Sequence, residues 1–181
     1  MNDAPPRRIW LCADDYGLAA GVNRAIRDLI SRGRLNATSV MMVGAAIGRA
    51  EVAALQDLAA NSPRCAIGLH ATLTAPFRPL TMHFRPTDGG LFLPFPKLLR
   101  AGLLRRLDPE MIEYELLAQL AAFKELFGRA PDFVDGHQHA QLFPGVRDAF
   151  LRAVKEAAPT AWVRQGGRLQ PLAKLLGAPK A

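Results

Sequence analysis

Residues 8–17 read RIWLCADDYG, a short apolar run that is ended at once by a polar turn containing a glycine. Such a run followed by such a turn is typical of a buried strand that enters a loop. We therefore predict a strand over 8–13 and a loop that begins at Asp14.

The rest of the chain alternates between strand-like and helix-like segments. Asp108-Pro109 is the clearest helix start, because Asp suits the N-cap and Pro the first helical position. The predicted elements are a helix over 22–33, a strand over 38–43, a helix over 46–60, strands over 65–69 and 133–137, helices over 108–128 and 144–157, and a strand over 161–164. This alternation, without internal repeats, predicts an α/β fold around a parallel sheet or barrel.

One long segment breaks the alternation. Residues 71–93 carry several prolines, the pair Gly89-Gly90 and no sustained hydrophobic period. We expect a long loop or small insertion here, and such a loop could cover a site.

Length and composition predict one domain over 1–181. The 181 residues are 50% apolar, enough to bury a core. Disorder is expected only in the first eight residues and after Gly166. Cys12 and Cys65 lie in apolar runs, which suits small buried side chains in a reducing, cytoplasmic location. No segment matches a signal peptide or the roughly 20 apolar residues that span a membrane.

The net charge of +7 raises the question of a nucleic-acid partner. The arginines are scattered, however, and the basic cluster over 97–106 alternates with leucines, as on a solvated amphipathic helix. No recognition motif for DNA or RNA accompanies it, so we expect no nucleic-acid partner.

Chemically active side chains follow the predicted strands. Asp14-Asp15 follows the first strand, His70 the third, and Asp135 to His139 closes the fourth. In parallel α/β folds, active sites gather at these carboxyl ends of the strands. An Asp pair or a single His at a strand end is more often structural than functional. Their occurrence together at three strand ends, however, favours a functional site.

The segment DGHQH at 135–139 makes the prediction more specific. In an extended segment, side chains two residues apart face the same way, so His137 and His139 can point at one centre with Asp135 beside them. Two neutral imidazoles and one carboxylate form a common half-open site for zinc, iron, manganese or magnesium.

Three motifs together resemble those of the YdjC-like carbohydrate deacetylases, the family that includes chitooligosaccharide deacetylase. They are ADDYGL at 13–18, IGLH at 67–70 followed by Leu73-Thr74, and DGHQH at 135–139. The run FGRAP at 127–131 is also similar to the family, and the likeness extends from about residue 9 to about residue 164. Three separated motifs in order are more specific than any one of them.

The resemblance implies an irregular (β/α) barrel and metal-assisted removal of the acetyl group from an N-acetylated sugar or oligosaccharide. Asp15, His70 and His137 would be the metal ligands, and Asp14 the general base that acts on the metal-bound water. The implied cofactor is a divalent ion, Mg²⁺ first, with Zn²⁺ or Mn²⁺ as alternatives. A divalent ion lowers the pKa of its bound water towards about 7, so a neighbouring carboxylate can take the proton.

The remaining motif residues receive supporting roles. Asp135 and His139 are expected to orient the ligands or contact the substrate rather than bind the metal directly. Tyr16 is expected either to line the sugar pocket or to pack as an ordinary aromatic side chain.

The sequence also departs from the family, whose members usually continue well beyond this point and carry a Cys-His-Pro-like motif with the general-acid histidine. No counterpart is present here, and residues 165–181 resemble the start of a further connection. We therefore expect a barrel that is incomplete at its C-terminal end. Its exposed strand edge and apolar surface would favour assembly into a homo-oligomer.

Two other functions stay open at this stage. A non-haem iron enzyme could use the same two-His-one-carboxylate set for oxygen chemistry. A remnant that binds a metal or a sugar without catalysis would fit the missing C-terminal motif.

Overall fold

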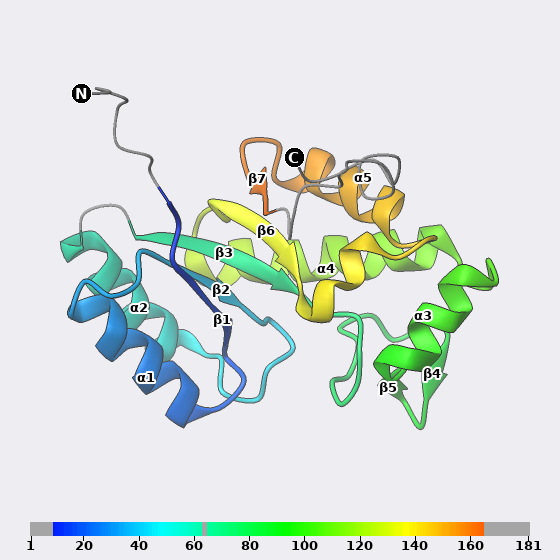
Figure 1. The fold of residues 1–181 in the computed structure, drawn as a ribbon, viewed down its shortest axis with the longest axis horizontal. Helices are drawn as coiled ribbons and strands as arrows, with labels where there is room; N and C mark the ends of the chain where they lie inside the picture. Colours follow the sequence, from blue (N-terminus) through cyan, green and yellow to red (C-terminus); the bar gives the residue numbers. More distant parts are fainter. Residues whose placement is uncertain (1–8, 63–64, 165–181) are drawn as a thin grey trace, which may run out of the picture.

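The computed structural model describes residues 9–62 and 65–164, in which strands and helices alternate (Figure 1). The elements are β1 (Cys12–Tyr16), α1 (Ala20–Ser31), β2 (Ala37–Val40), α2 (Arg49–Asn61), β3 (Ala66–Ala71), β4 (Thr87–Asp88), β5 (Leu91–Phe92), α3 (Phe95–Leu103), α4 (Pro109–Phe127), β6 (Phe133–Gly136), the 3-10 helix η1 (His137–Leu142), α5 (Arg147–Ala157) and β7 (Trp162–Val163). The predicted α/β class is confirmed. The disorder predicted before Ile9 and after Gly166 lies outside the described residues.

Five parallel strands form the main sheet, in the order β1-β2-β3-β6-β7. Because the order follows the sequence, right-handed crossovers place all the connecting helices on one face of the sheet. Figure 1 shows α1 beside α2 and α4 beside α5, and each of these two pairs is in contact. The carboxyl ends of all five strands therefore meet at one edge, where the loops that follow them can form a site.

The two edge strands, β1 and β7, are linked by side chains. The Trp10 ring, which precedes β1, stacks on Trp162 of β7 with centroids 5.8 Å apart. Arg164, which follows β7, forms an ion pair with Asp14 of β1. Within the described residues no backbone ladder joins these strands. The parallel sheet is therefore established, whereas the expected irregular (β/α) barrel and its incompleteness are not.

Helix α4 follows the sequence prediction closely. The Asp108 side chain accepts hydrogen bonds from the backbone N–H groups of Glu110 and Met111, at 2.9 and 3.4 Å. Gly128 ends the helix in the left-handed conformation, with φ 67°. One stripe of the helix is fully buried against the sheet, and each such side chain contributes about 1.5–3 kcal/mol. Its apolar members are Ile112, Leu116, Leu120, Phe123 and Phe127.

Several predicted boundaries were wrong at the site itself. Strand β1 begins at Cys12 and runs to Tyr16, so Asp14 and Asp15 lie in the strand and not in the loop after it. Strand β3 continues through His70 to Ala71. Both strands extend further than their apolar runs because pairing with β2 or β6 satisfies the backbone groups of the polar residues.

Other boundaries shifted without consequence for the site. Helices α2 and α5 begin at Arg49 and Arg147, three residues later than predicted. The predicted loop over 71–93 carries the small antiparallel pair β4–β5. The basic cluster over 97–106 lies largely on α3, as predicted. Among the described helices, none combines the length and the apolar character needed to cross a membrane.

Gly17, directly after β1, offers a test of the backbone at the site. Its φ is +101°, and a Cβ built there would lie 2.9 Å from the Met41 carbonyl oxygen. We expect Gly17→Ala to lower the free energy of unfolding by about 2 kcal/mol, since both strain and crowding oppose the new methyl group. Urea unfolding measures the change.

Gly21 of α1 is the matched control, because a Cβ there meets nothing within 4 Å. We expect Gly21→Ala to raise stability by about 0.5 kcal/mol through the lower entropy of the unfolded chain. Equal effects of the two substitutions would contradict the strain at Gly17.

Candidate metal centre

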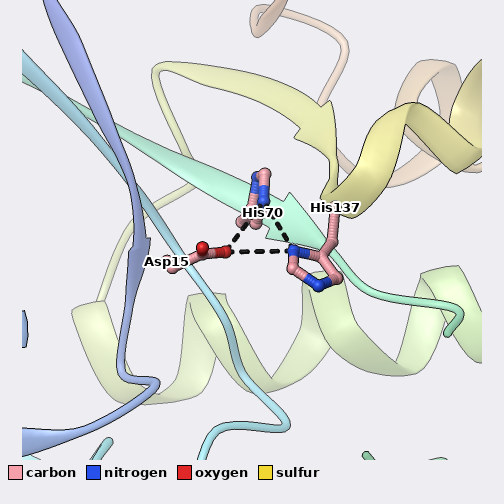
Figure 2. Close-up of side chains that lie close together, drawn as sticks. All are labelled: Asp15, His70 and His137. Carbon is pink, nitrogen blue, oxygen red and sulfur yellow. Dashed lines mark hydrogen bonds and ion pairs between the residues drawn. The ribbon is translucent and has the colours of Figure 1, made fainter. Parts of the chain in front are cut away.

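Three side chains from separate strands meet at the carboxyl edge of the sheet (Figure 2). Asp15 comes from β1, His70 from β3, and His137 is the first residue after β6. Asp15 Oδ1 lies 3.0 Å from His137 Nδ1 and 3.3 Å from His70 Nε2, and the two nitrogens are 3.3 Å apart. The structure thus brings together the three side chains that the resemblance names as metal ligands.

A β-bulge brings Asp15 into this group. Ala13 pairs with Thr38 and Tyr16 with Val40. Strand β1 thus advances three residues between these two pairs, while β2 advances two. Asp15 sits in the bulge with φ 68°, in the left-handed region. Successive residues of a regular strand point to opposite faces, and a bulge can re-aim one of them. Asp14 and Asp15 can therefore both act at the same end of the sheet.

The His70 ring is held from its far side. Its Nδ1 lies 2.5 Å from Asp135 Oδ1 and 3.2 Å from Ser39 Oγ, and both partners are buried. An ionised carboxylate can only accept, so Nδ1 carries a proton and donates a hydrogen bond to Asp135. In the neutral imidazole Nε2 then carries the lone pair, and that lone pair points at Asp15 and His137. A carboxylate behind a ligating histidine is a recurrent arrangement at metal sites.

The donor set fits a divalent cation. Ligands about 2.0–2.1 Å from a tetrahedral zinc ion lie about 3.3 Å from one another, and the separations here are 3.0, 3.3 and 3.3 Å. Two imidazole nitrogens and a carboxylate oxygen at these distances repel one another unless a proton or a cation lies between them. Asp15, His70 and His137 are the residues that would hold the ion.

The charges around the group shift two pKa values. Hydrogen bonds to His137 and His70 hold the pKa of Asp15 well below its usual range, so this carboxyl is ionised. Burial alone would lower the pKa of His70, but the hydrogen bonds to Asp135 and Asp15 outweigh it and raise that pKa to about 9. In the metal-free protein a proton on His70 thus balances part of the negative charge.

Arg164 is a site residue that our sequence analysis missed. Its Nη1 and Nη2 donate to the two carboxylate oxygens of Asp14, at 2.7 and 2.6 Å. Its Nη2 also lies 2.9 Å from Asp135 Oδ2, an ion pair without the directed geometry of a hydrogen bond. A signal was available, because Arg164 ends the predicted strand over 161–164 and so belongs to the same edge of the sheet as the ligands.

The bidentate contact of the Arg164 guanidinium also keeps the carboxyl group of Asp14 ionised. Burial raises the pKa of this carboxyl, but the hydrogen bonds from Arg164 outweigh the effect and lower it. The carboxylate also accepts a hydrogen bond from Ser39 Oγ, at 3.2 Å. Since Ser39 contacts His70 as well, Asp14 is connected to the ligand group without belonging to it.

A second group of donors, Cys12, Asp14 and Asp135, also converges. Here the guanidinium of Arg164 already lies against both carboxylates. Burial, followed by the charge of Asp14, raises the pKa of the Cys12 thiol to about 12, so the thiolate that a metal would need is disfavoured. We assign no metal to this second group.

The structure decides one open alternative at the site and contradicts one prediction. Tyr16 packs as a buried aromatic side chain and does not line a pocket: it is fully buried, and its hydroxyl contacts Glu51 and Arg27. His137 and His139 do not share a direction, because β6 ends at Gly136 and the chain turns into η1. His139 has φ 56° and is exposed, outside the convergent group. A signal for this turn was available, because the Asp135-Gly136 pair is a common turn dipeptide and the strand ends at Gly136.

The fold and the site define an α/β protein with a two-histidine, one-carboxylate cluster at the carboxyl ends of its parallel strands. The chain belongs to the family described as YdjC-like protein, whose family model matches residues 8–178. The resemblance noted in the three motifs is thereby confirmed.

Comparison with individual proteins agrees with this membership. The chain is 33% identical over 150 residues to a chitooligosaccharide deacetylase of Escherichia fergusonii, a match over 77% of this chain and 52% of that protein. It therefore spans about half the length of this curated relative. A crystal structure of a proposed cellobiose-phosphate cleavage protein from Enterococcus faecalis V583 shares the fold, with a TM-score of 0.72 and 21% identity over 87% of this chain and 58% of that one.

Removing Arg164 tests its place between the carboxylates. We expect Arg164→Gln to lower the free energy of unfolding by about 2 kcal/mol, because the buried Asp135 oxygen loses its cation. Arg152→Gln is the control, since the exposed Arg152 pairs with the half-buried Glu113, and the loss of this pair costs less than about 1 kcal/mol. Thermal unfolding of both variants measures the difference, and equal losses would contradict the assignment.

The raised pKa of His70 predicts a pH dependence of stability in the metal-free protein. Its folded value of about 9 exceeds the ordinary 6.5, so protonation stabilises the fold fully below pH 6.5, and this contribution is lost as the pH rises towards 9. We expect the free energy of unfolding to decrease over this interval in urea titrations with a chelator present. In His70→Gln the decrease should be smaller, and identical pH profiles would refute the prediction.

Proposed function

We propose that this chain is part of a metal-dependent carbohydrate deacetylase that removes the acetyl group from an N-acetylated amino sugar or oligosaccharide. The observation that carries the proposal is the convergence of Asp15, His70 and His137 with the ionised Asp14 beside them. Membership of the YdjC-like family and the deacetylase name of the Escherichia fergusonii relative support the reaction.

The ion would supply the electrophilic part of the chemistry. When bound, it polarises the amide carbonyl and lowers the pKa of the attacking water. Two imidazoles and one carboxylate accept Zn²⁺ or Mn²⁺ readily, and Mg²⁺, which prefers oxygen, would complete its shell with water. Calorimetric titration with each of the three ions separates these choices.

Asp14 is the proposed general base. Arg164 keeps it ionised at neutral pH and therefore able to accept a proton, although the same ion pair weakens it as a base. The bidentate contact also fixes the carboxylate plane, which general-base catalysis requires. Asp14 would thus take the proton from the attacking water while Asp15 stays a ligand.

Asp135 and His139 complete the proposed site. Asp135 orients His70 through Nδ1 and so keeps the Nε2 lone pair directed at the ion. His139 lies exposed on η1, two residues beyond the ligand His137, and contact with the substrate is its proposed role.

The architecture belongs to the same proposal. The sequential parallel sheet and the side-chain links between β1 and β7 support an irregular (β/α) barrel with residues 1–181 in a single domain. Three consecutive apolar side chains before β1, Ile9, Trp10 and Leu11, are exposed, which supports assembly with another copy or another part of a barrel.

Acetate release from N-acetylglucosamine oligomers, with a divalent ion present, tests the reaction. We expect Asp14→Asn to reduce turnover by about 10²–10⁴-fold, the usual contribution of a general base, while calorimetry shows that the ion still binds. Asp28→Asn, at an exposed pair with Arg32, is the control and should leave turnover unchanged.

The other outcomes discriminate the alternatives. Metal binding without acetate release by the unaltered chain would favour a binding remnant. Turnover that requires iron and oxygen would favour the non-haem iron enzyme, and turnover with Mg²⁺ or Zn²⁺ that is indifferent to oxygen would exclude it.

A further inference from the structure

The two histidines of the candidate metal centre are held in different ways. His70 is fixed through Nδ1 by the buried carboxylate of Asp135. His137 uses Nδ1 towards Asp15 and His70, and Figure 2 shows its second nitrogen pointing away from both. In the described part of the chain, Nε2 of His137 has no hydrogen-bond partner. On the side away from Asp15 and His70, the ring of His137 is therefore oriented by packing alone.

An aromatic ring supplies that packing. The Phe77 ring lies edge-on to the His137 ring, with centroids 5.8 Å apart and an interplanar angle of 85°. The ring of His70 packs against His137 in a similar way, at 5.3 Å and 78°. Edge-to-face pairs at such distances are favourable, and with two rings at right angles to it His137 has little freedom to rotate.

The backbone that carries Phe77 is anchored on both sides. Residues 72–81, which we name the arch, follow β3 directly. The Phe77 carbonyl accepts a hydrogen bond from the Phe92 N–H at 2.9 Å, and the Ala75 N–H donates to the Leu93 carbonyl at 3.0 Å. The arch is thus paired with the chain around β5, close to its middle.

Helix α4 anchors the two ends of the arch. Gln119 accepts from the Thr72 N–H at 2.9 Å and donates to the Thr72 carbonyl at 2.8 Å. The carboxylate of Glu115 accepts from the N–H groups of Leu80 and Thr81, at 3.1 and 2.9 Å, and from the Thr81 hydroxyl at 2.7 Å. Both anchoring side chains are fully buried, so these hydrogen bonds are shielded from water.

We propose that Phe77 is a positioning residue for the metal ligand His137, held in place by the arch that Glu115 and Gln119 fasten to α4. It does for His137 what the Asp135 carboxylate does for His70, through ring packing in place of a hydrogen bond. The inference rests on the metal site of the proposed function and adds a residue outside the three family motifs.

Calorimetric titration of the full chain with Zn²⁺ tests this inference, with thermal unfolding measured in parallel. We expect Phe77→Leu and Phe77→Ala to weaken the Kd for Zn²⁺ by roughly two- to tenfold, the range that corresponds to the loss of one aromatic pair. Phe77→Tyr, which keeps the ring, should restore the Kd to within about twofold of the unaltered chain.

The matched control is Phe95→Ala. Phe95 is also half-buried and also packs edge-on to an aromatic ring, that of Phe143, at 5.3 Å and 76°. We expect this substitution to lower thermal stability and to leave the Kd for Zn²⁺ unchanged. Equal weakening by the Phe95 and Phe77 substitutions would overturn the inference, because the effect would then reflect general destabilisation.

Two further outcomes separate the inference from the proposed function. An unchanged Kd in Phe77→Leu, with Zn²⁺ bound by the unaltered chain and not by Asp15→Asn, would overturn the role of Phe77 and leave the metal site standing. Failure of the unaltered chain to bind Zn²⁺, Mn²⁺ or Mg²⁺ would overturn both.

Discussion

The hydrogen bond between His70 Nδ1 and Asp135 is the interaction on which the site depends. It keeps a proton on Nδ1, so that Nε2, which faces Asp15 and His137, is the nitrogen that gives up its proton and offers a lone pair to a cation. With the opposite tautomer, Nε2 would present a proton to the centre, and a cation could not bind there. Both partners of this hydrogen bond are buried, so water competes little for them.

The charge balance follows from that geometry. Asp14, Asp15 and Asp135 place three carboxylates around one imidazole, and such a group is unstable without cations. Arg164 supplies one positive charge to Asp14 and Asp135 together, and the second falls to a proton on His70 or to a bound ion. Because Arg164 follows β7 and Asp14 lies in β1, the same contact joins the two edges of the sheet.

The regular sheet brings the ligands near one another, and the irregular segments beside it set their final positions. Parallel pairing in sequential order brings the carboxyl ends of β1, β3 and β6 to one edge, which accounts for the approximate meeting of the ligands. The fine placement comes from less regular structure: the bulge at Asp15, the turn into η1 at His137, and the arch that carries Phe77. Irregular backbone of this kind is common next to functional sites.

The sequence by itself determined the α/β class, the caps of α4 and the three strand ends that carry the ligands, because hydrophobic period, cap chemistry and motifs are local properties. Only the tertiary structure decided that Asp14 lies within a bulged strand and that His139 turns away. It also decided that Tyr16 is buried and that Arg164 and Phe77 join the site. These features depend on strand register and on contacts between residues far apart in the chain, so no local pattern encodes them.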